Sequence, residues 1–224
     1  MNVRELTVPG AWELLPRQHA DDRGVFLEWF TAAALREATG RDLDLAQANA
    51  SVSRAGVVRG IHYADVPPGQ AKYVTCVAGS VLDVVVDLRV GSPAFGRWDA
   101  VLLDAHERRA VFLPEGVGHA FMALEDGATV VYLCSSGYAP EREHGVDPTD
   151  PELAIEWPTT GPDGRALVPS FSAKDAAAPS LRAARAAGAR ARAGGVAGGG
   201  GRLAGEVSRP RRAGPAGARA ARPR

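Results

Sequence analysis

The chain has 224 residues, of which 46% are hydrophobic, enough for one large buried core or two small ones. Its net charge of zero conceals an uneven distribution, because residues 181–224 hold 11 arginines and one acid, Glu206, which leaves residues 1–180 acidic. No apolar run is long enough to span a bilayer, and the first ten residues carry charges and lack the apolar segment of a secretory signal. We therefore expect a globular protein of the cytoplasm with no membrane partner.

The first clear element in chain order is a helix over residues 31–39. Thr31 is placed to cap its first turn and Gly40 to end it. The segments after it are short and apolar, with turns at intervals of roughly 8 to 12 residues, which is typical of β-strands in a sandwich or barrel. The strand segments are KYVTCV, VLDVVVDLRV, WDAVLL, RRAVFLP, HAFMAL and ATVVYLCS. The pattern predicts a mainly β fold of the jelly-roll kind with a few short helices.

The segment VLDVVVDLRV has the clearest alternation of apolar and charged residues. Leu82, Val84 and Val86 fall on one face, and Asp83 and Asp87 fall on the other. Such a period of two predicts a half-buried strand with one face in solvent. The three residues AGS before it predict a hairpin that joins it to the preceding strand, KYVTCV.

The two cysteines lie inside apolar segments. Cys76 is in YVTCVAG and Cys134 is in VVYLCSS, far from any C-x-x-C spacing. The pattern favours buried free thiols in a reducing compartment, and leaves open a disulfide or a catalytic thiol.

Residues 181–224 consist almost wholly of Ala, Gly, Arg and Pro and contain no aromatic residue. Such a segment cannot bury enough apolar surface to offset its chain entropy, so we expect one folded domain over residues 1–180 and a disordered tail over 181–224. The arginines would bind nucleic acid phosphates in a salt-dependent way. Because no base-stacking aromatic residue or base-reading module accompanies them, we expect no specific nucleic-acid partner.

Polar residues on strands are the candidates for a site, since a small barrel can hold one ligand in its interior. Taken singly, each also fits a satisfied polar group at a barrel mouth. Lys72 is the exception, because it is one of only two lysines beside 24 arginines. A compact ammonium placed where the chain otherwise uses guanidinium groups indicates a specific role, such as contact with a developing oxyanion.

Six separated segments, in order, resemble the dTDP-4-dehydrorhamnose 3,5-epimerase family. They are RGIHY with PPGQAKYV, GSVLDVVVDLRVGSPAFGRW, LPEGVGHAFMAL, VYLCSSGYAPEREHGVDPTDPELAIEWP and SFSAKD. The resemblance runs from about residue 3 to about residue 180. It implies a cupin-type jelly roll and an epimerase that acts on a dTDP-4-keto-6-deoxy sugar without metal or other cofactor, in dTDP-rhamnose or antibiotic deoxysugar biosynthesis.

The resemblance also implies a role for individual residues. In the family pattern His62 matches the base that removes the proton next to the C4 ketone, and Tyr132 matches the proton donor on the other face of the ring. Lys72 matches the residue at the enolate oxygen, and Asp175 matches the carboxylate that orients the histidine. Substrate-binding positions are matched by Arg23, Glu28, Gln47, Asn49, Arg59, His119, Tyr138, Glu143 and Lys174. Tyr138 would stack on the thymine ring. A homodimer is implied in which the N-terminal segment, with Arg23 and Glu28, serves the neighbouring site.

Several alternatives remain at the level of sequence. Ala64 and Asp65 follow RGIHY where many members have Gln, which resembles the branch in which some enzymes invert C3 alone. A metal-dependent cupin would need a close His-x-His pair, and residues 62–64 read His-Tyr-Ala. A non-catalytic sugar-nucleotide-binding cupin would not require His62, Tyr132, Lys72 and Asp175 together. A 3,4-ketoisomerase would use the same substrate, and its motifs fit less well.

Overall fold

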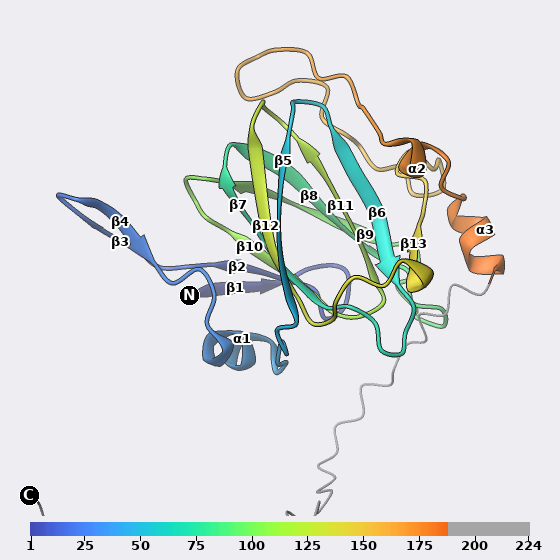
Figure 1. Cartoon of the computed structure of the whole chain (residues 1–224), viewed down its shortest axis with the longest axis horizontal. Coiled ribbons are helices and arrows are strands. Elements are labelled where there is room, and N and C mark those ends of the chain that lie inside the picture. The colour runs from blue at the N-terminus through green and yellow to red at the C-terminus, as the bar shows by residue number, and fades with distance from the viewer. Residues whose placement is uncertain (188–224) are drawn as a thin grey trace, which may run out of the picture. The chain divides into compact units, whose positions relative to one another are not determined.

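A computed structural model describes residues 1–187 of the chain, which form two packed antiparallel β-sheets with short helices around them (Figure 1). The strands are β1 (Asn2–Glu5), β2 (Trp12–Leu15), β3 (Gln18–Asp21), β4 (Gly24–Leu27), β5 (Gln47–Ser53), β6 (Val58–Ala64), β7 (Lys72–Ala78), β8 (Ser80–Asp87), β9 (Trp98–Asp104), β10 (Ala110–Leu113), β11 (Val117–Ala123), β12 (Ala128–Cys134) and β13 (Glu143–Gly145). The helices are α1 (Ala32–Thr39), η1 (Pro140–Arg142), α2 (Ala173–Ala176) and α3 (Leu181–Ala186). The expected mainly β fold is confirmed.

The strand order follows the jelly-roll pattern. The six-stranded sheet runs β1-β2-β10-β7-β12-β5, and the five-stranded sheet runs β13-β6-β11-β8-β9. Strands β5, β6, β7 and β8 therefore alternate between the two sheets, as do β10, β11, β12 and β13. Successive strands face one another across the interior, so residues near in sequence lie on opposite walls of it.

This alternation overturns the hairpin expected at AGS. Strand β7 pairs with β10 and β12, whereas β8 pairs with β9 and β11. Gly79 has a φ of 68° and turns the chain from one sheet to the other. The chain does reverse at this turn, but the two strands that it joins belong to different sheets.

The predicted helix is confirmed at both ends. The hydroxyl of Thr31 accepts a hydrogen bond from the N–H of Ala34, and Gly40 adopts the left-handed conformation that ends the helix. Helix α1 places Leu35 on the outer face of the six-stranded sheet, against Tyr73 and Phe112. Burial of this apolar face stabilises a helix of eight residues that would not persist in isolation.

The strand expected to be half-buried is buried on both faces. Val84 and Val86 of β8 point outward, where the segment that includes Leu153 and Leu181 covers them. Asp83 points inward, into the space between the sheets, and is 1% exposed. The alternation of the two faces is confirmed, but the charged face lies in the protein interior and not in solvent.

The folded structure also continues past residue 180, where the composition placed its end. Ser180 caps α3 by accepting from the N–H of Ala183, and Leu181 and Ala184 are buried against the five-stranded sheet. Two small apolar contacts and a cap thus order a segment that is poor in large hydrophobic residues. The expectation of a disordered tail concerns residues 188–224, which lie outside the described residues.

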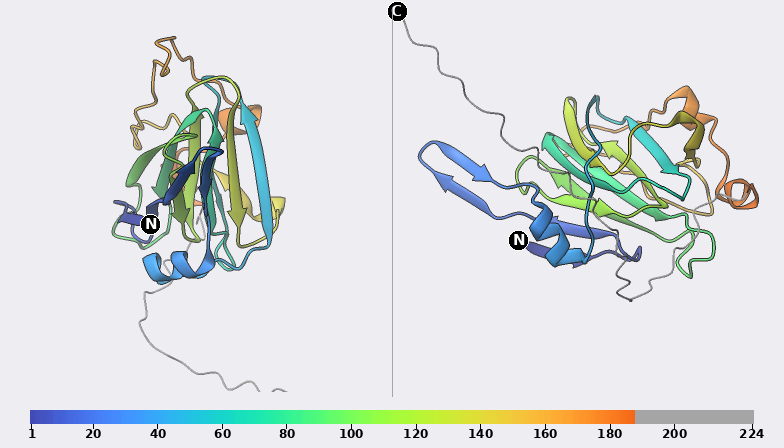
Figure 2. Two further views of the ribbon diagram at one scale, coloured as in Figure 1. Left: turned by 90° about the vertical axis from the view of Figure 1, so that its left-hand side faces the viewer. Right: turned by 60° about the horizontal axis from the view of Figure 1, so that its bottom comes forward.

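A hairpin of β3 and β4 projects from the two sheets (Figures 1 and 2). Its side chains are almost all exposed, including Val25 at 56% and Phe26 at 68%. Gln18 at its base donates to the carbonyl of His106 over 2.7 Å. Among residues 1–187, no helix is both long and apolar enough to cross a membrane.

Candidate active site

A cavity with two lobes opens between the two sheets. The first lobe has a volume of about 450 Å³ and the second about 510 Å³. Both are lined by the same five residues, which join them into one space: His62, Lys72, Tyr132, Tyr138 and Glu143. We call the first the amide lobe, because Gln47, Asn49 and Gln70 complete it, and the second the basic lobe, because Arg59, His119 and Lys174 complete it.

His62 is held against Asp175 at the junction of the lobes. Its Nε2 lies 2.7 Å from Asp175 Oδ1, and since a carboxylate only accepts, Nε2 donates and Nδ1 is the free ring nitrogen. Asp175 is fixed by α2, where its N–H donates to the hydroxyl of Ser172. Burial lowers the pKa of His62, against the opposing hydrogen bond to Asp175. The imidazole is therefore neutral at neutral pH and able to accept a proton.

Lys72 begins β7 on the opposite sheet, where it is the register partner of Cys134. Burial lowers the pKa of its ammonium, and Cys134, Glu143 and Asp83 act in the opposite direction. An ammonium half-buried in a cavity wall can stabilise negative charge on a substrate oxygen more strongly than it could in water.

Tyr132 lies on β12, beside Lys72 and across the cavity from His62. Burial raises the pKa of its hydroxyl, and Cys134 and Glu143 raise it further, while Arg59 opposes them. The phenol thus keeps its proton at neutral pH. A protonated hydroxyl on one sheet therefore faces a neutral imidazole on the other.

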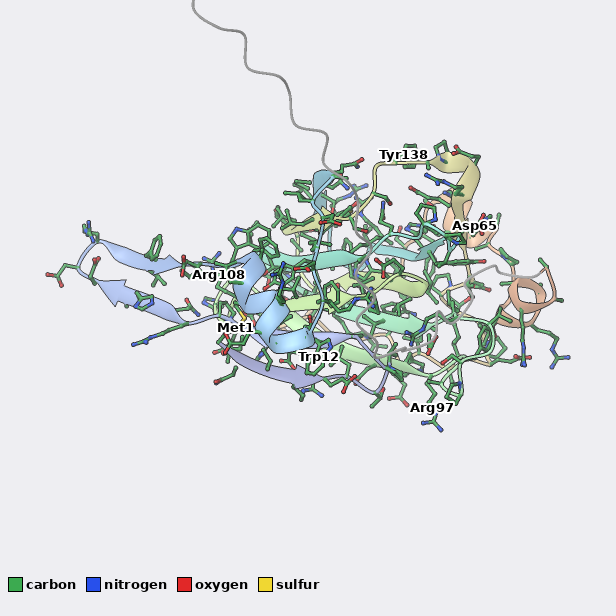
Figure 3. All side chains as sticks on the ribbon, turned by 90° about the horizontal axis from the view of Figure 1, so that it is seen from below. Met1, Trp12, Asp65, Arg97, Arg108 and Tyr138 are labelled. Atoms are coloured by element: carbon green, nitrogen blue, oxygen red, sulfur yellow. The ribbon has the colours of Figure 1, made fainter. Side chains whose placement is uncertain are left out.

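A chain of hydrogen bonds lines the amide lobe. The N–H of Tyr138 donates to Gln47 Oε1 over 2.9 Å, and Gln47 Nε2 donates to Asn49 Oδ1 over 2.8 Å. Asn49 Nδ2 in turn lies 3.7 Å from the Cys134 sulfur. Tyr138 is 66% exposed and lies at the margin of the molecule in Figure 3. An exposed aromatic ring at a cavity mouth is a suitable stacking surface for a nucleobase.

The basic lobe carries cationic side chains suited to a diphosphate. Arg59 Nε donates to the Ser53 hydroxyl over 3.1 Å, which fixes the guanidinium on the lobe wall. His119 is held by Asp83, with 2.7 Å between Nε2 and Oδ2. Asp83 was missed as a site residue, although an acid at an alternating position within an apolar strand was a signal for it.

The structure brings eleven of the thirteen expected site residues to this cavity. Arg23 and Glu28 are the two that it leaves out. Both lie on the projecting hairpin or directly after it, and the Arg23 side chain is 89% exposed and paired with Asp21. The expected free thiols are confirmed, since Cys76 and Cys134 are buried and neither forms a disulfide. Within residues 1–187 no three His, Cys, Asp or Glu side chains gather as a metal site.

Comparison with known proteins gives consistent matches over the described residues. The family model described as dTDP-4-dehydrorhamnose 3,5-epimerase matches residues 5–183. A Mycobacterium tuberculosis protein of that name is 58% identical over 180 residues, which cover 80% of this chain and 87% of the relative. A Streptomyces niveus dTDP-4-dehydrorhamnose 3-epimerase is 62% identical over 162 residues, covering 72% and 78%.

Solved structures agree with the sequence matches. A Mycobacterium tuberculosis epimerase is similar with a TM-score of 0.81 and 56% identity, over 86% of this chain and 94% of that one. A 3'-monoepimerase from Streptomyces bikiniensis, solved in complex with dTDP-quinovose, gives a TM-score of 0.75 and 52% identity, over 82% and 89%.

Proposed function

The chain belongs to the dTDP-4-dehydrorhamnose 3,5-epimerase family, and we propose that its cavity is the active site, with His62 as base, Tyr132 as acid and Lys72 at the enolate oxygen. The protein is an epimerase of a dTDP-4-keto-6-deoxy sugar in rhamnose or antibiotic deoxysugar biosynthesis, and we propose that it inverts C3 and C5, with inversion of C3 alone as the alternative. The observation that carries the assignment is the placement of His62, held by Asp175, and of Tyr132 on opposite sheets of the same cavity.

The reaction proceeds through an enolate. The hydrogens on C3 and C5 are acidic because each carbon is adjacent to the C4 ketone. His62 Nδ1 takes the proton from the carbon, and the electron pair moves onto the C4 oxygen, where the Lys72 ammonium stabilises it. Tyr132 then delivers its proton to the opposite face of the same carbon, which inverts it. Asp175 holds the imidazole and stabilises its cationic form.

The two lobes account for the rest of the substrate. Arg59, His119 and Lys174 would bind the diphosphate in the basic lobe, while Tyr138 would stack on thymine at the cavity mouth. Gln47, Asn49 and Glu143 would bind polar groups of the sugar and base. The hydrogen bonds from Tyr138 through Gln47 to Asn49 run along one wall of the cavity. They connect the residue that would stack on the base to a residue that would bind the sugar.

Deuterium incorporation tests the proposed reaction. We expect the protein in deuterium oxide, without added metal or nicotinamide, to introduce deuterium at C3 and C5 of dTDP-4-keto-6-deoxyglucose, as followed by NMR. Label at C3 alone would identify the C3-only reaction that the 3-epimerase relatives catalyse. No label at either carbon would contradict the epimerase assignment.

We also propose a homodimer in which the hairpin of β3 and β4 reaches the partner's cavity. Arg23 and Glu28 lie outside the cavity of their own chain, and Val25 and Phe26 leave apolar surface exposed beside them. Sedimentation equilibrium should therefore give the mass of two chains, and a monomer at micromolar concentration would contradict this arrangement.

The two free thiols fit the reducing cytoplasm, where we place the enzyme.

A further inference from the structure

Asp83 is a buried acid with an unusual environment. Its side chain is 0% exposed, and its strand neighbours Val81 and Val85 pack in the apolar core between the sheets. Oδ2 pairs with His119, but Oδ1 is buried and has no hydrogen-bond partner among the described residues. A buried carboxylate with one oxygen unpaired destabilises a fold unless nearby positive charge compensates, and an apolar residue of similar size would serve packing better.

The compensating charges belong to the cavity. His119 and Lys72 both line the basic lobe, whereas Asp83 does not line it and lies behind its wall. The strands on either side of β8 present Phe121 and Val101 directly opposite Asp83, so no other charged group is paired with it in register. The carboxylate therefore acts on the two lobe residues and not on solvent or substrate.

Lys72 has few negative groups that can balance it. The titratable and charged groups that line its cavity or act on it come from every element around it: Arg59 and His62 on β6, Asp83 on β8, His119 on β11, Tyr132 and Cys134 on β12, Tyr138 after β12, Glu143 on β13, and Lys174 and Asp175 on α2. Burial raises the pKa of the Cys134 thiol, so this group is uncharged at neutral pH. Asp175 is paired with His62, so Glu143 and Asp83 are the carboxylates that oppose deprotonation of Lys72, and of these two Asp83 is the one shielded from water.

We propose that Asp83 is a positioning residue of the epimerase: its carboxylate fixes the ring of His119 and supplies the buried negative charge that balances the Lys72 ammonium. This inference rests on the proposed function, since it assigns Asp83 to the same reaction. The pairing leaves Nδ1 of His119 for the substrate. It also explains why an apolar core holds an acid whose second oxygen has no partner.

Two substitutions separate the two effects. Asp83→Asn keeps an oxygen that can accept from His119 and removes only the charge, whereas Asp83→Leu removes both and fills the core. We measure the ratio of the deuterium-incorporation rate at pH 9 to the rate at pH 7. In Asp83→Asn we expect this ratio to be about tenfold smaller than in the wild type, because Lys72 without the Asp83 charge loses its proton at a lower pH than it does in the wild type. In Asp83→Leu we expect the same change together with a severalfold rise in KM.

Asp87→Asn is the matched control. Asp87 is another fully buried acid of β8, but it is held by Arg89 and Ser92 and lies away from the cavity. This variant should melt at lower temperature and keep the wild-type pH profile. The proposal is overturned if Asp83→Asn also keeps that profile, or if Asp83→Leu leaves KM unchanged. If the wild type incorporates no deuterium, the reaction assignment fails, whereas ¹⁵N shifts of His119 still test the pairing, since they should differ between wild type and Asp83→Leu.

Discussion

Replacing His62 by alanine should lower the rate of deuterium incorporation by roughly 10²- to 10⁴-fold, the usual contribution of a positioned general base. The cavity then lacks the neutral imidazole that accepts the proton, while Lys72 and Tyr132 remain in place. The measurement is NMR of the sugar in deuterium oxide. Substrate affinity should change little, since the effect falls on the chemical step.

His144→Ala is the matched control for this variant. His144 also pairs with an aspartate, at 3.0 Å from Asp65, and it lies on β13 next to β6, but it does not line the cavity. We expect it to retain nearly the wild-type rate. If His62→Ala retained its exchange rate while His144→Ala lost it, the base would have been assigned to the wrong histidine.

Replacing Lys72 by methionine should lower kcat by about 10²- to 10³-fold, because the enolate oxygen loses the ammonium that would stabilise its negative charge. The same change should also lower the melting temperature. The buried Asp83 carboxylate and Glu143 lose the cation that balances them, and removing one partner of a buried charge pair destabilises a fold.

A double substitution distinguishes a catalytic from a structural lysine. Lys72→Met combined with Asp83→Asn removes both charges and should recover stability without recovering activity, whereas recovery of activity would show that Lys72 acts mainly through ion pairing. Lys174→Met offers a comparison within the same cavity, since this second lysine lies in the basic lobe. We expect that variant to raise KM for the dTDP sugar more than it lowers kcat.

Elements with local determinants could be predicted from the sequence. Helix α1 was located because Thr31 and Gly40 form its caps within the same few residues that form the helix. The residues 72–78 and 80–87 were recognised as strands because alternation of side chains is also local. Strand pairing is not local, so the turn at Gly79 could not reveal that β7 and β8 belong to different sheets.

The same limitation explains why Asp83 was missed. An acid that alternates with valines has the same sequence pattern whether its face meets water or a second sheet, and only the position of β11 beside β8 shows that His119 lies within hydrogen-bond distance. Eleven cavity residues were found because the chain resembles a known family, which supplies contacts that sequence periodicity does not. Arg23 and Glu28 could not be placed, since a single chain does not contain the cavity proposed for them.

The division of the reacting groups between the two sheets has a consequence for the choice of substrate. His62 belongs to one sheet and Lys72 and Tyr132 to the other, so the width of the hydrophobic core sets the distance between base and acid. Packed sheets lie about 10 Å apart, which leaves room for one sugar ring with close contacts on both faces. The valines that fill the core thus determine how thick a ring can react. Enlarging or trimming them would retune the enzyme for sugars with bulkier or thinner substituents without altering any residue that the substrate touches.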